Sequence, residues 1–172
     1  TEEEKPQILS KWREANKKVV SLWSSLEDCA KRCIGTRREQ VYSINDVSNI
    51  IFRYESGALT IEIPSGRKLF YPSARMGRRT IEGVNGSFEV EDISYMGQDQ
   101  TSGNWVKLNT YGGKLTENVV QAIARDLLAN AIFKVFDLGF NIVLHVHDEI
   151  AAEIPKDGNE EKTLQIMSDA MC

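Results

Sequence analysis

Apolar residues recur at intervals of three and four along two long segments of the chain. In residues 6–34 they occupy Ile8, Trp12, Ala15, Val19, Trp23, Leu26, Ala30 and Cys33. This spacing predicts one amphipathic helix with a single buried stripe. Pro6 suits the first turn of that helix, and Gly35 suits its C-terminal exit.

A longer helix is predicted over residues 115–138. Its apolar positions form an unbroken ladder with steps of four, at Leu115, Val119, Ile123, Leu127, Ala131 and Val135. Gly139 is expected to end it. At the usual rise per residue, such a helix is roughly 36 Å long and can cross a small domain.

Alternating apolar and polar residues predict strands elsewhere in the chain. Residues 58–71 contain the turn sequence Pro-Ser-Gly and predict a β-hairpin. Residues 87–97 and 104–108 predict further short strands, whereas residues 41–56 are ambiguous. A last hairpin over residues 140–154 precedes a final helix. This order predicts an α+β fold, with hairpins of an antiparallel sheet packed on long helices.

Charge is distributed unevenly along the 172 residues, although the formal net charge is only -4. No acidic residue lies between Glu62 and Glu82, and the stretch from Asp148 onward is acidic. The interval without acidic residues holds a basic group, namely Arg67, Lys68, Arg75, Arg78 and Arg79. We interpret it as a basic loop that either binds an anion or is simply solvated.

The three cysteines, Cys29, Cys33 and Cys172, form neither a disulfide framework nor a metal-binding pattern. A reducing, intracellular setting is the simplest interpretation. The sequence contains no signal peptide and no apolar run long enough to span a membrane. It begins in a helix approach and stops in mid-helix without a cap, so we expect a fragment of a longer polypeptide.

The last predicted hairpin, "NIVLHVHDEIAAEIP", carries four ionisable residues between two apolar strands. His145 and His147 are two apart and share one face of a strand. Asp148 and Glu149 fall at the tip. A carboxylate held between apolar strands is costly unless a cation compensates it. Mg²⁺ suits this role, because it binds one or two carboxylates together with substrate phosphates.

Several interpretations of this hairpin remain open from the residues alone. The tip can simply be solvated. A zinc site on His145 and His147 needs at least one more nitrogen or sulfur ligand, and the chain has only these 2 histidines. A two-metal phosphoryl or nucleotidyl transferase needs a second carboxylate from elsewhere. A metal-dependent nuclease needs a second acidic cluster, and the only candidate, residues 89–93, fits an alternating strand better.

Four segments resemble family A (DNA polymerase I-like) DNA polymerases, in the order found in that family. "VHDEI" at residues 146–150 resembles the third conserved motif, and "TYGGKLTENVVQAIARDLL" at 110–128 resembles the preceding helix in the phage and prophage branch. "WREANKKVVSLW" at 12–23 is similar to the helix after the nucleotide-binding helix of the fingers. "IPSGRKLFYP" at 63–72 resembles the Gly-Arg-Arg hairpin of the family.

This resemblance implies that residues 1–172 are the C-terminal part of a polymerase domain with a palm-type sheet. Residues 1–40 would be the helix that follows the fingers. Residues 41–108 would hold hairpins and the basic loop. Residues 109–172 would hold the palm helix, the motif hairpin and a truncated last helix.

The resemblance also implies roles for residues of the motif hairpin. Asp148 would be a catalytic metal ligand, Glu149 would support the metal site or the primer end, and His147 would contact the primer terminus. Two Mg²⁺ ions would be shared with an aspartate outside this chain.

Contacts to DNA are expected from residues before the hairpin. Asn109 matches an asparagine that contacts the minor groove in the family, whereas Gly113 stands at a glutamine position and cannot replace its side chain. Lys114 or Gln121 can substitute. The basic loop, with Arg67, Lys68, Arg75, Arg78 and Arg79, is expected to contact phosphates.

The implied activity is that of a DNA-directed DNA polymerase, with primer–template DNA, dNTP and the remainder of the polymerase chain as partners. The expected location is the cytoplasm of a bacterial or phage-infected cell. The 172 residues lack the second catalytic aspartate and the fingers helix that bears Arg, Lys and Tyr. The chain alone is therefore expected to be inactive. The alternative is a non-catalytic DNA-binding or structural module with the same fold.

Overall fold

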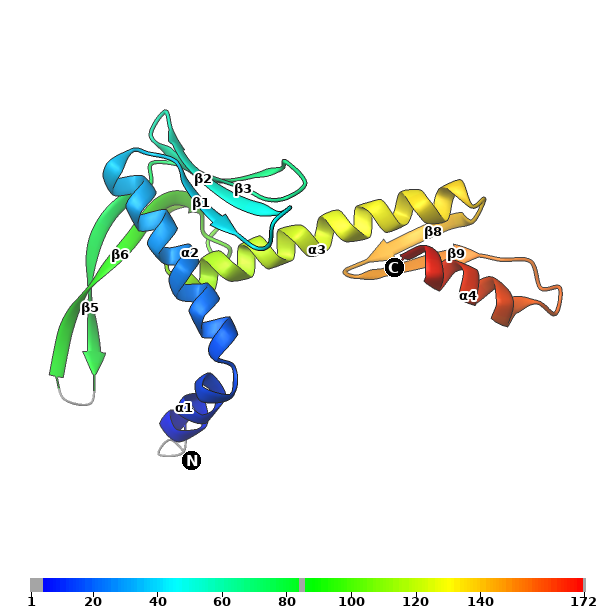
Figure 1. The fold of residues 1–172 in the computed structure, drawn as a ribbon, viewed down its shortest axis with the longest axis horizontal. Helices are drawn as coiled ribbons and strands as arrows, with labels where there is room; N and C mark the ends of the chain where they lie inside the picture. Colours follow the sequence, from blue (N-terminus) through cyan, green and yellow to red (C-terminus); the bar gives the residue numbers. More distant parts are fainter. Residues whose placement is uncertain (1–4, 84–85, 172) are drawn as a thin grey trace. The chain divides into compact units, whose positions relative to one another are not determined.

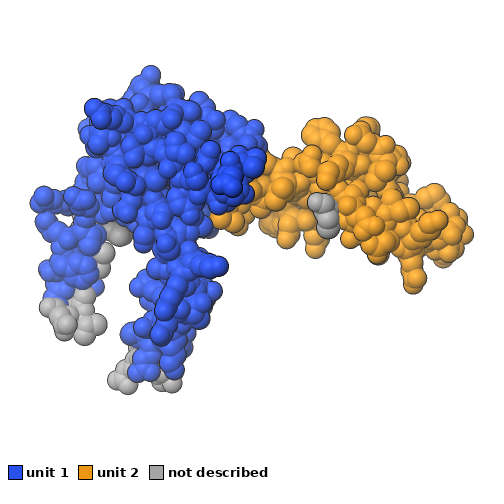
Figure 2. Space-filling model, viewed as in Figure 1, with its two compact units in different colours: residues 1–119 blue, residues 120–172 orange. Residues whose placement is uncertain are grey.

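The computed structural model describes residues 5–83 and 86–171, except for the side chains of Lys5, Arg79 and Ile81 (Figure 1). The chain forms two compact units, residues 1–119 and 120–172 (Figure 2). All strand pairs are antiparallel. The predicted α+β class with antiparallel sheets is therefore confirmed.

Among its described residues, the first unit contains two helices, seven strands and the start of a third helix. These elements are α1 (Lys5–Ala15), α2 (Lys17–Thr36), β1 (Gln40–Ser43), β2 (Asn49–Glu55), β3 (Ala58–Glu62), β4 (Lys68–Tyr71), β5 (Arg75–Gly83), β6 (Gly86–Gln98), β7 (Trp105–Thr110) and α3 (Gly112–Asp137). The second unit contains the rest of α3, β8 (Asn141–Val146), β9 (Glu149–Glu153) and α4 (Glu160–Met171).

The predicted first helix is interrupted at Asn16, which separates α1 from α2. Both the backbone N–H and the side-chain amide of Asn16 donate to the carbonyl of Trp12, at 2.9 and 2.8 Å. The rings of Trp12 and Trp23 stack across this break, with centroids 5.6 Å apart. Ile8 is 65% exposed, so the buried stripe is confined to the second half of α2. The prediction of one continuous helix was wrong because a side-chain amide competes for helical carbonyls.

Helix α2 packs against a four-stranded sheet with the order β1-β2-β3-β4 (Figure 1). The core between them contains Leu26, Ala30, Cys33, Phe52, Leu59 and Ile61. The predicted hairpin of residues 58–71 is confirmed as β3–β4, and Gly66 adopts a φ of 83° in its turn. The ambiguous residues 41–56 form β1 and β2.

A second sheet has the order β5-β6-β7. Its long hairpin, β5–β6, begins at the pair Arg75↔Ser94 and ends at the pair Gly83↔Gly86. The predicted basic loop is therefore wrong for residues 75–79, which form a strand. Arg75 and Arg78 lie on opposite faces of the sheet, because side chains in a strand point to opposite sides in turn.

The apolar ladder predicted on α3 is only partly buried. Leu127 is 66% exposed, whereas Leu128 is 8%, Ala131 4% and Val135 0% exposed. Each step of four residues overshoots one helical turn by about 40°, so a strict ladder drifts around the helix. The buried apolar side chains of α3 instead form two groups, namely Leu115, Val119 and Ala122, and Leu128, Ala131 and Val135. Within each group the residues are three or four positions apart. None of the described helices is long and apolar enough to cross a membrane.

Tyr71 links β4 to α3 within the first unit and is only 3% exposed. The side-chain amide of Asn118 donates to its hydroxyl oxygen at 2.9 Å. Burial raises the pKa of Tyr71 from an ordinary 10.0 to about 12, because the charged phenolate loses hydration, while the Asn118 hydrogen bond opposes this shift.

This shift predicts a loss of stability in alkaline solution. Because the folded-state pKa of Tyr71 is raised, its contribution is fully present below pH 10 and is lost as the pH approaches 12. The loss should be about 2–3 kcal/mol of unfolding free energy. Urea unfolding at pH 9 and pH 11.5 should show this loss for the native chain, and a smaller one for Tyr71→Phe. Equal losses in both proteins would contradict the assignment.

Candidate active site at the tip of the last hairpin

His147 and Asp148 form the two-residue loop between β8 and β9. Val146 pairs with Glu149 on the opposite strand, so the loop contains only these two residues. His147 has a φ of 52°, in the left-handed region. Two-residue hairpin loops require a positive φ at this position and favour glycine or asparagine there. Holding a histidine in this left-handed backbone conformation costs about 1 kcal/mol or more, and such strained residues are common at functional sites.

The strands beside the loop are less buried than the sequence pattern predicted. Val143 is 54%, Leu144 56% and Val146 45% exposed. A register shift between Ile142 and Leu144 leaves Val143 without a partner in β9. The position of Asp148 is therefore set by the hairpin turn and its strand pairing, and apolar packing on both sides does not hold it.

The hairpin tip and α3 together line an open pocket of about 550 Å³, within the second unit. Its lining residues are Gln121, Ala124, Arg125, Leu128, His147 and Asp148. The helical residues follow steps of three, one and three, so they lie on one face of α3. Three residues predicted from the sequence, namely Gln121, His147 and Asp148, thus line the same pocket.

The pocket contains two opposite charges that no described residue neutralises. Asp148 and Arg125 are both exposed. In the part of the chain that the structure describes, neither forms an ion pair or a hydrogen bond through its side chain. A carboxylate and a guanidinium in one pocket can bind a ligand that combines a metal cation with a phosphate.

The donor set suits a shared magnesium site better than a closed zinc site. The Asp148 carboxylate and the Gln121 amide oxygen are oxygen ligands that Mg²⁺ accepts. His145 lies opposite Ile150 and does not line the pocket. Across residues 5–83 and 86–171, no group of three or more His, Cys, Asp or Glu side chains is placed to hold a metal. Glu149 is exposed but does not line the pocket either.

The other predicted DNA contacts lie in the first unit. Asn109 is exposed near the end of β7, opposite Ser94. Lys114 is exposed in the first turn of α3. Gly113 lies beside Lys114 and, as the sequence indicated, offers no side chain for a hydrogen bond.

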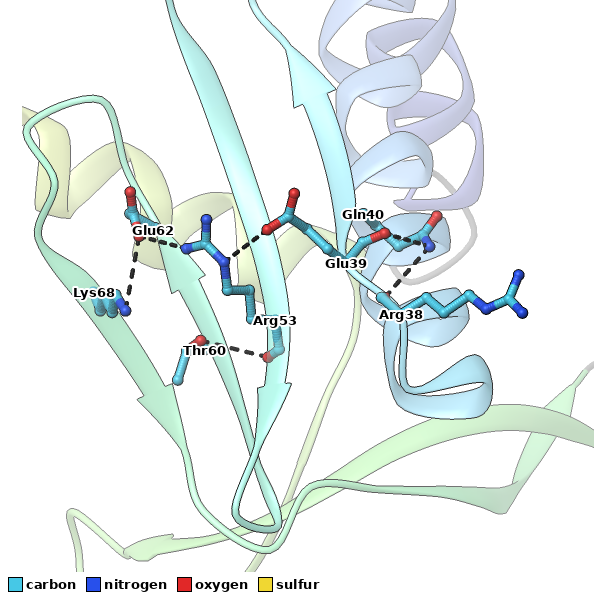
Figure 3. Close-up of polar contacts among 7 residues, drawn as sticks. All are labelled: Arg38, Glu39, Gln40, Arg53, Thr60, Glu62 and Lys68. Carbon is cyan, nitrogen blue, oxygen red and sulfur yellow. Dashed lines mark hydrogen bonds and ion pairs between the residues drawn. The ribbon is translucent and has the colours of Figure 1, made fainter.

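The predicted cations of the basic loop differ in their surroundings. Lys68 approaches Glu62 at 3.8 Å, within a network in which Glu62 also binds Arg53 at 2.6 Å (Figure 3). Arg78 lies 3.5 Å from Glu89. Arg67 follows the β3–β4 turn and is also engaged in an interaction. The side chain of Arg79 lies outside the described residues.

Arg75 lies on the face of β5 opposite to that of Arg78, because it pairs with Ser94 whereas Arg78 pairs with Glu91. A cation that already forms an ion pair within the protein binds a phosphate more weakly than an unpaired one. Among the predicted cations of this strand, Arg75 is therefore the described one best suited to bind DNA.

Arg125 is the residue of the pocket that the sequence analysis missed. It lies four residues after Gln121, and this spacing places two helical residues on one face. That signal was present in the sequence. However, nothing local indicated that this face meets the tip of a hairpin more than twenty positions later.

A DNA polymerase of Bacillus phage SP02 is 38% identical to this chain over 169 residues. The match covers 98% of the chain and 24% of the phage protein. The chain therefore spans about a quarter of the length of the curated relative it matches. No family model and no solved structure matches the chain.

Proposed function

We propose that this chain is part of a family A DNA polymerase and contributes one half of its catalytic metal site. The observation that carries the proposal is the pocket in which the uncompensated Asp148 and Arg125 meet His147 at a two-residue hairpin tip. The similarity of nearly the whole chain to the phage SP02 DNA polymerase supports the same function.

The proposed reaction is nucleotidyl transfer to a primer. The 3′-oxygen of the primer attacks the α-phosphorus of a dNTP, the new P–O bond forms, and the bond to the leaving pyrophosphate breaks. The 3′-hydroxyl loses its proton to water in this step. Mg²⁺, when bound, would supply the charge that lowers the pKa of this hydroxyl and stabilises the leaving pyrophosphate. Asp148 would hold the metal, together with an aspartate outside this chain.

The remaining pocket residues would position the primer end. His147 would contact the sugar-phosphate of the primer terminus, and the Gln121 amide would hydrogen-bond beside it. Arg125 would stabilise negative charge on the reacting phosphate, because a guanidinium binds phosphate oxygens in a bidentate manner. Glu149 would act from just outside the pocket, by supporting the metal site. Asn109 and Lys114 would contact the duplex.

A non-catalytic DNA-binding module remains the second candidate. It is favoured by one observation, namely that Asp148 is the only carboxylate lining the pocket of the described chain. Primer extension by the full-length protein that contains this chain separates the two candidates. Template-directed incorporation supports the polymerase, whereas DNA binding without incorporation supports the module.

Arg125→Gln tests the pocket itself. We expect incorporation to slow by about tenfold, because one charged contact to the reacting phosphate is lost. The measurement is single-nucleotide incorporation with saturating DNA. Lys134→Gln is a matched control, because it removes an exposed cation from the same helix outside the pocket. A rate for Arg125→Gln that equals the control would remove Arg125 from the proposed mechanism.

A further inference from the structure

A second pocket, of about 340 Å³, lies on the β5-β6-β7 sheet of the first unit. Residues from all three strands and from the turn before β5 line it, among them Ser73, Arg75, Gly77, Ser94, Met96 and Lys107. No acidic residue is among its lining residues. This pocket shares no lining residue with the candidate active site.

The strand register places its two cations on the same face of the sheet. Arg75 pairs with Ser94 across β5 and β6, and Met96 pairs with Lys107 across β6 and β7. Residues directly opposite one another, and residues two apart, share a face. The backbones of β5 and β7 are two strand spacings apart, about 10 Å. Two long basic side chains can therefore reach one phosphate group from opposite sides.

These two cations are available to a ligand. Both Arg75 and Lys107 are exposed, and neither has an ion-pair partner in the described part of the chain. The nearest acidic residue on this face of β6 is Asp92, which is 5% exposed and already engaged in an interaction. The pocket therefore has a local positive charge on a protein with an acidic net charge.

The wall of the pocket is held in place by the surrounding backbone. The N–H of Met96 donates to the carbonyl of Pro72 at 2.8 Å, and the hydroxyl of Tyr54 donates to the carbonyl of Ala74 at 2.9 Å. Ser73 lies between these anchors with a φ of 54°. A non-glycine residue in this conformation persists only where the surrounding structure enforces it, and it is common at binding sites.

The same face continues toward features that suit a nucleic-acid strand. Trp105, Lys107 and Asn109 alternate along the edge strand β7, so they share this face. Trp105 is 62% exposed. A cation beside an exposed aromatic ring is typical of surfaces where phosphates are neutralised and bases stack. A free phosphate ion could contact the two cations, but it has no base that could stack on the Trp105 ring.

We propose that this pocket binds one phosphodiester of a DNA strand, between Arg75 and Lys107, with a neighbouring base against Trp105. The inference rests on the proposed polymerase function for its ligand, but it assigns Lys107 and Trp105, which the sequence resemblance did not indicate. The Ser73 and Ser94 hydroxyls would donate to the same phosphate. Gly77 leaves the pocket open, because a Cβ placed there would meet no atom closer than 3.9 Å.

The test is binding of a 5′-fluorescein primer–template DNA by the full-length protein, measured by anisotropy at several salt concentrations. The double variant Arg75→Gln/Lys107→Gln should bind about tenfold more weakly at low salt. Its slope of log affinity against log salt should be shallower by about 0.9, the value for one phosphate. Arg38→Gln removes an exposed cation from the connection between α2 and β1, outside the residues that line this pocket, and should leave the slope unchanged.

Gly77→Val provides a second variant, which fills the pocket while keeping both cations. It should lower the affinity for DNA to a similar extent without changing the melting temperature by more than a few degrees. If both variants bind with the slope of the native protein, the proposal is wrong.

DNA with one methylphosphonate at a time identifies the ligand. A single uncharged position should weaken binding of the native protein and leave binding of the double variant unchanged. If inorganic phosphate or dNTP alone competes for the pocket, and no methylphosphonate position in the DNA weakens binding, the assignment of DNA as the ligand is wrong. If the slope changes as expected but the native protein incorporates no nucleotide, only the polymerase function fails. If incorporation is normal and the slope is unchanged, only the pocket assignment fails.

Discussion

Asp148→Asn is expected to reduce nucleotide incorporation by the full-length protein by about a thousandfold or more. Asparagine keeps the shape of the side chain but removes the negative charge that would hold the metal. Asp148 is exposed at a hairpin tip and its side chain accepts no hydrogen bond from the described residues, so its replacement should leave the fold intact. The loss should therefore appear in the rate of the chemical step and not in the amount of folded protein.

Rapid-quench measurement of single-nucleotide incorporation, at several Mg²⁺ concentrations, gives the required rate. Thermal unfolding should show a change of stability below about 0.5 kcal/mol. Glu161→Gln on α4 is the matched control, because it removes an exposed carboxylate outside the pocket. Glu149→Gln should have a smaller effect than Asp148→Asn, since Glu149 does not line the pocket. Retention of a tenth of the native rate by Asp148→Asn would exclude its role as a metal ligand.

Gly112→Ala is expected to destabilise the first unit by about 3 kcal/mol or more. A Cβ on Gly112 would collide with the backbone carbonyl of Trp23 in α2 and would approach the Glu27 carboxylate at 2.8 Å. The N–H of Gly112 also donates to this carboxylate at 2.9 Å, so Glu27 caps the start of α3. A rigid carbonyl cannot move aside without shifting α2 itself.

Gly113→Ala is the natural control for this steric argument. Its Cβ would meet only the Tyr111 ring, at 3.0 Å, and Tyr111 is 52% exposed and able to move. Alanine is favoured over glycine in a helix by about 1 kcal/mol, so this variant should be neutral or stabilised. Urea unfolding of both variants measures the difference. Equal stabilities would show that packing against α2 does not require glycine at residue 112.

The sequence by itself determined several of the elements and the chemistry of the last hairpin. Helix α3 was predicted because its apolar residues recur along one segment, and hairpins β3–β4 and β8–β9 were predicted from alternation around turn residues. Asp148 was placed at a tip for the same reason. Such patterns depend only on neighbours within a few residues, and local backbone geometry then decides which of them share a face.

The tertiary structure decided which of these faces meet. Arg125 became a candidate because its face of α3 lines a pocket with the β8–β9 tip. Arg75 and Lys107 came to share one face because of the register of β5 and β7 on β6, and Gly112 proved to be a packing residue against α2. Each outcome depends on contacts between segments distant in the chain. Packing and strand register set those contacts, and no local periodicity encodes them.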